Sequence, residues 1–270
     1  MKWGTLSRAE QDAAYDNIAA VADSAALNAA RAEASAAFRA AHPGHLDLRY
    51  GPRGRNAWDL FPAADPAAPC LVFIHGGYWQ RNGREQFANL MAGPRAMGWS
   101  AALPGYTLAP DASLTGIVAE TNAALDWLAA HGPAHGIAGP VVLSGWSAGG
   151  HLTALCLGHP LVRAGLAISG IFELGPLRDT SLNDKLRLTD QEIAALSPLR
   201  LPVTDKPLAI AYGTAELPAL VRDSRALHAR RAAAHLPGTL IPVPGGDHFT
   251  IVHALRDRDG LLTRHLGTLV

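Results

Sequence analysis

Short apolar runs recur through most of the chain and alternate with longer stretches of helical character. The runs that we interpret as strands are residues 70–74, 100–103, 141–144, 164–168, 208–212 and 239–243. The helical stretches between and after them are residues 84–97, 114–131, 148–157, 217–234 and 250–266. This alternation predicts parallel β-α-β units in one doubly wound α/β sheet, because parallel neighbours need a crossover that is long enough to hold a helix.

An antiparallel hairpin and a long helix are predicted ahead of this alternating region. Residues 46–50 and 56–61 alternate apolar and polar positions around the turn-forming sequence GPRG, so they predict two edge strands. Residues 7–41 predict one helix, which begins with a capping box formed by Ser7 and Glu10.

Residues 172–207 interrupt the rhythm of strands and helices with a long polar stretch. Long insertions in compact domains are usually functional or disordered. This one follows the strand at residues 164–168, at the carboxyl edge where doubly wound sheets bind ligands, so we interpret it as a cap over a pocket. No repeat or domain linker is recognisable, and we expect one domain over residues 1–270, with residues 1–45 as its N-terminal helical segment.

Composition narrows the class of function. The chain has 23 Lys and Arg against 23 Asp and Glu, so no net charge favours binding to nucleic acid or to an anionic membrane. The first residues lack the apolar core of a signal peptide, and charges interrupt the alanine-rich residues 18–41, which argues against a membrane span. Cys70 and Cys156 are too few for a disulfide framework. We expect a cytoplasmic protein that acts on a small molecule, either as a monomer or as a homodimer.

The sequence GWSAG at residues 145–149 carries the clearest chemical signal. It follows the predicted strand at residues 141–144 and opens the predicted helix at residues 148–157. Ser147 therefore lies on a sharp strand–turn–helix junction, which is the context of a nucleophile elbow. A turn this tight needs glycine on both sides, because side chains have no room there. A serine in an ordinary turn would not have a strand before it and a helix after it with glycine on both sides. Ser147 is therefore our candidate nucleophile.

A second motif, HGGYW at residues 75–79, directly follows the predicted strand at residues 70–74. In the α/β-hydrolase plan, a glycine-rich loop after an early strand supplies main-chain N–H groups to the oxyanion hole. The candidate oxyanion residues are Gly76, Gly77, Tyr78 and Ala148, the last of which follows the nucleophile. Together the two motifs predict an α/β-hydrolase fold and acyl transfer through a serine.

The candidate base and acid follow from the order Ser, acid, His that this fold uses along the chain. His248 comes after the last predicted strand, in the sequence PGGDHF, and is the candidate base among twelve histidines. Glu216 comes just beyond the strand at residues 208–212 and is the candidate acid, which would orient the imidazole and stabilise its charged form.

Other acids fit the position less well. Asp205 precedes the strand, Asp223 lies deeper in the following helix, and Asp247 adjoins the base. Glu216 has an alternative role as a first-turn carboxylate that the helix dipole favours. The sequence leaves both roles of Glu216 open.

Four aromatic residues lie near these loops and are candidates for the substrate pocket, with packing in the core as the alternative. They are Trp79, Trp146, Phe172 and Phe249. His75 is expected to hold the oxyanion loop by hydrogen bonding, and His151 to pack beneath the elbow. No HExxH or clustered His, Cys and Asp pattern suggests a metal, and the chemistry inferred from the motifs needs no cofactor.

These motifs resemble those of the kynurenine formamidase, or arylformamidase, branch of the α/β-hydrolases. The HGGYW sequence matches the HGGxW oxyanion motif of that branch, and residues 247–249, DHF, resemble its base loop. The other similar segments are YG at 50–51, DLFP at 59–62, SGIFEL at 169–174 and SP at 197–198. The resemblance covers residues 46–270.

The resemblance implies hydrolysis of N-formylkynurenine to kynurenine and formate without a metal. The chain departs from the family pattern at Trp146, where histidine is frequent, at Gly150, where alanine is frequent, and at Glu216, where aspartate is usual. A broad carboxylesterase for short acyl esters uses the same machinery and is the second hypothesis. A non-catalytic binding protein is the third, and the intact candidate triad argues against it.

Overall fold

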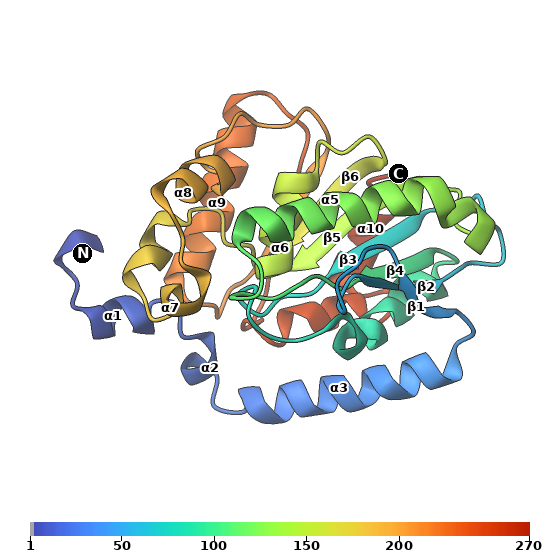
Figure 1. Ribbon diagram of the computed structural model, residues 1–270, viewed down its shortest axis with the longest axis horizontal. Helices are drawn as coiled ribbons and strands as arrows, with labels where there is room; N and C mark the ends of the chain where they lie inside the picture. The colour runs from blue at the N-terminus through green and yellow to red at the C-terminus, as the bar shows by residue number, and fades with distance from the viewer. Residues whose placement is uncertain (1–2) are drawn as a thin grey trace.

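The computed structural model of the protein describes residues 3–270 and contains one eight-stranded sheet (Figure 1). Its strand order is β1-β2-β4-β3-β5-β6-β7-β8. Strand β2 pairs antiparallel with β1 and β4, and every other pair is parallel. The strands are β1 (His45–Arg49), β2 (Ala57–Phe61), β3 (Cys70–Ile74), β4 (Ser100–Pro104), β5 (Val141–Trp146), β6 (Val162–Ile168), β7 (Leu208–Gly213) and β8 (Leu240–Val243). The predicted hairpin at the sheet edge and the predicted parallel sheet are both confirmed.

Helices cover both faces of the sheet. The α-helices are α1 (Arg8–Ala13), α2 (Asn17–Ala20), α3 (Ser24–Ala41), α4 (Ala92–Ala96), α5 (Leu114–His131), α6 (Ala148–Cys156), α7 (Asn183–Leu186), α8 (Asp190–Leu196), α9 (Pro218–Ala233) and α10 (Leu261–Leu266). The 3₁₀ helices are η1 (Trp3–Thr5), η2 (Arg84–Met91), η3 (Gly132–His135), η4 (Gly175–Asp179) and η5 (Ile251–Leu255).

The sheet separates two apolar cores. Val72 and Ile74 of β3 pack in the cluster that includes α5, α6 and α9, whereas Leu71 and Phe73 pack in the cluster that includes η2, η5 and α10. Successive side chains of a strand point to opposite faces, so a strand covered on both sides must be apolar throughout. This explains why β3 reads as a continuous apolar run rather than an alternating one.

The sheet topology places a crevice at the end of β3. From β3 the chain moves to β4 on one side and then returns to β5 on the other, so the strand order reverses between β3 and β5. Ligands bind doubly wound sheets at the carboxyl ends of the strands around such a reversal. The loop after Ile74 and the turn after Trp146 both leave the sheet at this point.

The N-terminal segment differs from the single helix predicted for residues 7–41. Ser7 and Glu10 form the expected capping box, but α1 ends at Ala13, and two further helices follow. Asp16 caps α2 by accepting the N–H of Ala19, 3.0 Å away. The breaks bury Tyr15 and Asn17 against the body of the molecule, and tertiary contacts of this kind override the helix propensity of an alanine-rich sequence.

Two other predicted helices are also divided. Residues 84–97 form η2 and then α4, with Pro94 in the first turn of α4, where a missing N–H is tolerated. Residues 250–266 form η5 and α10, separated by a turn that ends at Gly260. A side chain at Gly260 would collide with the carbonyl oxygen of Ala254, so the chain can fold back closely only with glycine there.

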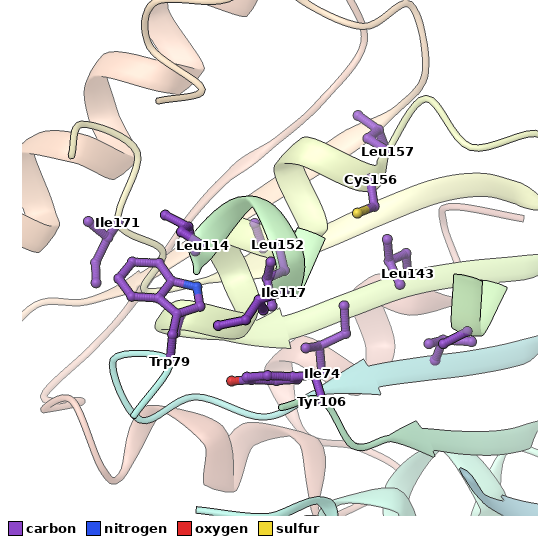
Figure 2. Packing of buried hydrophobic residues seen from close by; sticks show 14 of the residues in the cluster. Ile74, Trp79, Tyr106, Leu114, Ile117, Leu143, Leu152, Cys156, Leu157 and Ile171 are labelled. Atoms are coloured by element: carbon purple, nitrogen blue, oxygen red, sulfur yellow. The ribbon is translucent and has the colours of Figure 1, made fainter. Parts of the chain in front are cut away.

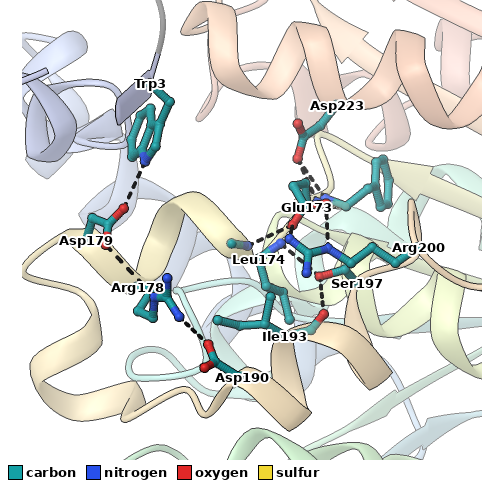
Figure 3. Close-up of polar contacts among 12 residues, drawn as sticks. Trp3, Glu173, Leu174, Arg178, Asp179, Asp190, Ile193, Ser197, Arg200 and Asp223 are labelled. Atoms are coloured by element: carbon teal, nitrogen blue, oxygen red, sulfur yellow. Dashed lines mark hydrogen bonds and ion pairs between the residues drawn. The ribbon is translucent and has the colours of Figure 1, made fainter. Parts of the chain in front are cut away.

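The insertion at residues 172–207 is compact and is fastened by polar contacts (Figure 3). Asp223 of α9 accepts the N–H groups of Phe172 and Glu173 at 2.9 and 3.0 Å. Slightly further along the insertion, Trp3 donates its indole N–H to Asp179 at 3.1 Å. The N-terminal segment and the insertion therefore lie against each other near the crevice.

Candidate active site

The turn between β5 and α6 has the backbone geometry of a nucleophile elbow. Ser147 has φ 58° and ψ −117°, a conformation that L-residues rarely adopt. A side chain at Gly145 would collide with the carbonyl group of Gly149, and one at Gly149 would collide with the carbonyl oxygen of Ile74. The two glycines of the motif are thus required by close backbone approach, as the sequence predicted.

Ser147, His248 and Glu216 form a continuous hydrogen-bonded row. Nε2 of His248 lies 3.1 Å from Oγ of Ser147, and Nδ1 lies 2.6 Å from Oε1 of Glu216. All three residues are buried, with exposed fractions of 1%, 4% and 8% for Ser147, His248 and Glu216. A carboxylate only accepts, so Nδ1 of a neutral imidazole carries the proton, and Nε2 is left free to accept the proton of the serine.

Glu216 is held on both of its oxygens. While Oε1 faces His248, Oε2 accepts the hydroxyl of Ser169 and the N–H of Gly213, each at 2.8 Å. Gly213 ends β7 and Ser169 follows β6, so two neighbouring strands fix the carboxylate. Sequence reasoning missed Ser169, because its contact with Glu216 joins residues 47 positions apart.

The alternative acids are occupied elsewhere. Asp247 accepts the N–H groups of Phe249 and Thr250 within its own turn. Asp223 holds the start of the insertion and forms an ion pair with Arg222. Asp205 precedes β7, at the end of the strand remote from the crevice. The geometry therefore favours Glu216 among the four acids.

The HGGYW loop follows β3 and faces the elbow. Gly77, Tyr78 and Trp79 all have positive φ, at 121°, 49° and 56°. Within residues 3–270, neither the N–H of Gly77 nor that of Tyr78 donates to a protein acceptor. A Cβ at Gly76 would lie only 2.6 Å from the carbonyl oxygen of Trp146 and 2.9 Å from Cβ of Ser147, so glycine lets the loop touch the elbow.

His75 holds the HGGYW loop in place through its ring and its carbonyl oxygen. Its Nδ1 lies 2.9 Å from the carbonyl oxygen of Gly76, and its ring stacks on Tyr106 with centroids 4.3 Å apart. The hydroxyl of Tyr106 donates to the carbonyl oxygen of His75 at 3.0 Å. Burial lowers the pKa of His75 to about 3, so the ring is neutral and acts as a structural support, as the sequence predicted.

A pocket of about 370 Å³ opens above Ser147, and its wall contains Gly77, Tyr78, Trp146, His248 and Phe249. Most of the remaining wall comes from the N-terminal segment. The residues that this segment contributes are Asp12, Tyr15, Asp16, Asn17, Ile18 and Asn28. The insertion at residues 172–207 contributes only Ser181 and Leu182. The N-terminal segment thus forms more of the pocket wall than the insertion that we interpret as a cap.

The aromatic prediction was half wrong. Trp146 and Phe249 line the pocket, but Trp79 and Phe172 do not. Both of the latter are fully buried in the core on the α5–α6 side of the sheet, where Figure 2 shows the indole of Trp79 among Leu114 and Ile171. The positive φ of Trp79 turns its side chain inward, a direction that the order of residues along the chain does not reveal.

His151 and Trp146 support the elbow from two sides. His151 is fully buried, contacts the edge of Trp79, and lies with Nε2 2.8 Å from the carbonyl oxygen of Leu196. Trp146 donates its indole N–H to the carbonyl oxygen of His248 at 2.8 Å. The residue that departs from the family pattern beside the nucleophile therefore fastens the loop that carries the candidate base.

The N-terminal segment is tied to the oxyanion loop through one side chain. The hydroxyl of Tyr78 donates to the carbonyl oxygen of Tyr15 at 2.6 Å and accepts the side-chain N–H of Asn17 at 2.9 Å. Because these partners lie 61 and 63 residues away in the sequence, no local pattern indicated the contact.

Residues 3–270 contain no group of three or more His, Cys, Asp or Glu side chains arranged to hold a metal ion. Among the same residues, no helix is both long and apolar enough to cross a membrane.

Comparisons with known proteins agree with this fold. Residues 60–159 match the BD-FAE family model. The kynurenine formamidase of Danio rerio is 24% identical over 83% of this chain and 81% of its own, and that of Salmo salar is 28% identical over 82% and 80%. The crystal structure of a putative thioesterase from Silicibacter sp. TM1040 superposes with a TM-score of 0.84 and 30% identity, over 94% of this chain and 98% of that one. Esterase B of Lactobacillus rhamnosis shares the fold, with a TM-score of 0.73 at 23% identity.

The chain belongs to the α/β-hydrolase superfamily, as the sheet topology, the elbow geometry and the superposition over nearly its whole length require. It is a hydrolase. Within the superfamily it is kynurenine formamidase-like, with formamidases as its relatives in sequence and esterases and a putative thioesterase as its neighbours in structure.

Proposed function

We propose that this hydrolase uses Ser147 as nucleophile, His248 as general base and acid, and Glu216 as the group that orients the imidazole. The row of hydrogen bonds from Glu216 through His248 to Ser147, ending at the floor of the pocket, carries this proposal. A serine hydroxyl is a poor nucleophile until a positioned base takes its proton. The arrangement supplies that base and leaves no role that would need a metal ion or an organic cofactor.

The first half of the reaction forms an acyl-serine. Oγ of Ser147 attacks the carbonyl carbon of the substrate while Nε2 of His248 takes the hydroxyl proton. The N–H groups of Gly77, Tyr78 and Ala148 stabilise the resulting oxyanion, and one such donor is typically worth about 3 kcal/mol. His248 then gives the proton to the departing nitrogen or oxygen, the bond to the leaving group breaks, and the acyl group stays on Ser147.

The second half returns the enzyme to its starting state. Water enters the pocket, His248 takes one of its protons, and the hydroxide attacks the acyl-serine carbon. Collapse of the second tetrahedral intermediate releases the carboxylic acid, and Ser147 regains its proton from His248. Glu216 stabilises the transient imidazolium through Oε1, while Oε2 is held by two donors.

The proposed substrate is an aryl amide of a small acyl group, with N-formylkynurenine as the leading candidate. The kynurenine formamidases of two fishes resemble the chain over about four-fifths of its length, and a pocket of about 370 Å³ is in the range of small-molecule sites. An aryl amine is a better leaving group than an alkyl amine, which suits a serine hydrolase. Both cysteines are buried and unbridged, which suits the reducing cytoplasm.

A carboxylesterase for short acyl esters is the second candidate, and the neighbours in structure favour it. Esterase B shares the fold, and the same triad cleaves an ester more easily than an amide. Trp146 stands where the formamidase pattern has histidine, and it lines the pocket next to the nucleophile. The two candidates differ in the substrate but share every catalytic step.

Three substrates separate the candidates. We would measure kcat/KM for N-formylkynurenine, for its N-acetyl analogue and for p-nitrophenyl acetate. The formamidase proposal expects the formyl amide to be cleaved far faster than the acetyl amide. Rapid turnover of the ester with no turnover of either amide would establish the carboxylesterase instead. A protein that hydrolyses none of them and is not labelled by a fluorophosphonate would contradict both.

A further inference from the structure

Arg31 is a buried cation on the face of α3 that packs against the body of the molecule. Arg31 is only 2% exposed. It lies on the same buried face of the helix as Ser24, Ser35 and Phe38. Ser35 fastens this face by bonding to the side chain of Asn89, at 2.9 Å. Arg31 is therefore held in place by the packing of the whole helix and not by its own flexible stem.

The charge of Arg31 has no carboxylate beside it. Its guanidinium lies over the rings of Phe87 and Trp146, 4.4 and 5.4 Å from their centroids, and its Nε has no partner among the described residues. Burial, and the positive charge of Arg256 nearby, lower the pKa of Arg31 to about 10. Buried charges in proteins are normally paired, so a buried arginine without a carboxylate partner among residues 3–270 favours an anionic ligand nearby.

Arg31 reaches the pocket through Asn28. Its Nη2 donates to Oδ1 of Asn28 at 2.6 Å, and Asn28 lines the pocket above Ser147. An arginine can only donate, so Oδ1 of Asn28 must face it, and the amide nitrogen of Asn28 must turn the other way. Asn28 is half-buried, and its amide nitrogen donates to no acceptor among residues 3–270, so Asn28 offers N–H donors whose direction is set by a charged group.

We propose that Arg31 and Asn28 form a recognition site for a carboxylate carried by the substrate. Asn28 donates to the carboxylate directly, and Arg31 is a positioning residue that fixes the amide and supplies positive charge behind it. Trp146 links this site to Ser147, because its ring lies under the guanidinium and it lines the same pocket as the nucleophile. The inference rests on the proposed function, because the amino acid part of N-formylkynurenine carries such a carboxylate.

Arg81 provides a competing explanation that the experiment must exclude. It also lines the pocket, it is exposed, and its guanidinium makes no hydrogen bond or ion pair within residues 3–270. An exposed arginine is solvated and needs no ligand, whereas Arg31 is buried and makes no ion pair with any carboxylate among residues 3–270. The uncompensated burial therefore favours the site at Arg31 and Asn28.

The first experiment compares N-formylkynurenine with its carboxamide, which keeps the shape and removes the charge. For Asn28→Ala and Arg31→Met we expect the ratio of kcat/KM for the acid to kcat/KM for the carboxamide to fall about 10- to 100-fold, mainly through KM of the acid. Arg31→Lys should recover part of the ratio, since it keeps the charge. Arg95→Met is the matched control, because Arg95 is also a partly buried helix arginine but bonds only to carbonyl oxygens of β2 and its neighbour.

A binding readout keeps the test independent of turnover. Kynurenine should protect Ser147 from a fluorophosphonate at about 10- to 100-fold lower concentration than kynurenine carboxamide does, and Asn28→Ala should abolish that difference. This difference in protection can be measured even if N-formylkynurenine is not hydrolysed. The proposed carboxylate site and the proposed function are therefore tested independently. Equal protection by acid and carboxamide in the parent enzyme, or loss of the difference in Arg81→Met but not in Asn28→Ala, would overturn the site. If Arg31→Met does not fold, Asn28→Ala alone decides.

Discussion

The two sides of the pocket are built in different ways. The catalytic side consists of short glycine-rich turns at the ends of β3, β5, β7 and β8, where each reacting group is buried and held by neighbouring strands. The opposite side consists of helices α1 to α3, which are largely exposed and reach the catalytic side through a few polar contacts, such as Tyr78 with Asn17. Figure 1 shows this segment extending along the outside of the sheet domain.

The difference indicates that the two sides have different functions. The catalytic side contains what acyl transfer needs whatever the substrate is, whereas the N-terminal side supplies most of the remaining pocket wall. Substitutions on the first side should therefore remove turnover of every substrate. Substitutions on the second side should change which substrate is bound and how firmly the wall is attached.

The largest effect should come from the nucleophile. Ser147→Ala should lower kcat by about a millionfold, because the members of a triad act as a unit, and should end labelling by a fluorophosphonate. Ser144→Ala is the control, since Ser144 lies in β5, just before the nucleophile, but donates to the carbonyl oxygen of Leu166. Retained labelling of the Ser147→Ala variant would show that the reactive serine is elsewhere.

The next effect separates the base from its orienting acid. His248→Ala should cost about as much as loss of Ser147, whereas Glu216→Gln should lower kcat about ten-thousandfold, because the amide holds the wrong tautomer. The two changes combined should be far from additive. Asp247→Asn serves as the control, because Asp247 only stabilises its own turn. A larger loss in Asp247→Asn than in Glu216→Gln would identify a different acid.

Acid should weaken the catalytic side through two buried histidines. Burial lowers the pKa of His75 to about 3 and that of His151 to about 4, both below the value of 6.5 in the unfolded chain. Between these values the unfolded chain binds more protons, so the stability is complete above pH 6.5 and falls as the pH decreases toward 4. Each histidine contributes about 1.4 kcal/mol per pH unit.

Denaturant unfolding at several pH values tests this expectation. The free energy of unfolding should decrease from pH 6.5 to pH 4.5, and the slope should become shallower in His151→Gln, whose side chain no longer titrates. An unchanged slope in that variant would mean that other groups dominate the acid response.

The smallest effect concerns attachment of the N-terminal wall. Tyr78→Phe removes a hydroxyl that bonds both to Tyr15 and to Asn17, and leaving buried groups unpaired costs about 1–3 kcal/mol. We expect faster hydrogen exchange over residues 12–20 and a KM raised about tenfold, since part of the wall is then less often in place. Unchanged exchange over these residues would show that the segment is held by other contacts.

The sequence alone determined the sheet and the choice of candidate catalytic residues. The apolar runs predicted six of the strands nearly to the residue, and the strands buried on both faces, such as β3, β5 and β7, have the simplest signature. Ser147, His248 and Glu216 could be selected because the chain order of this fold places each one just after a strand. Helix α5 was also predicted at its observed bounds, since its apolar residues recur at helical spacing and its first turn is capped by Ser113.

Tertiary structure decided the rest of the pocket. Contacts that join distant residues broke the N-terminal helix at Tyr15, turned Trp79 and Phe172 into the core, and brought Ser169 to Glu216. They also brought Asn28 into the pocket wall, next to Arg31, which has no ion pair among residues 3–270. Local patterns encode elements and tight turns, because those depend on neighbours in the chain. The direction of a side chain and the residues that it contacts depend on packing between distant segments, which no local pattern contains.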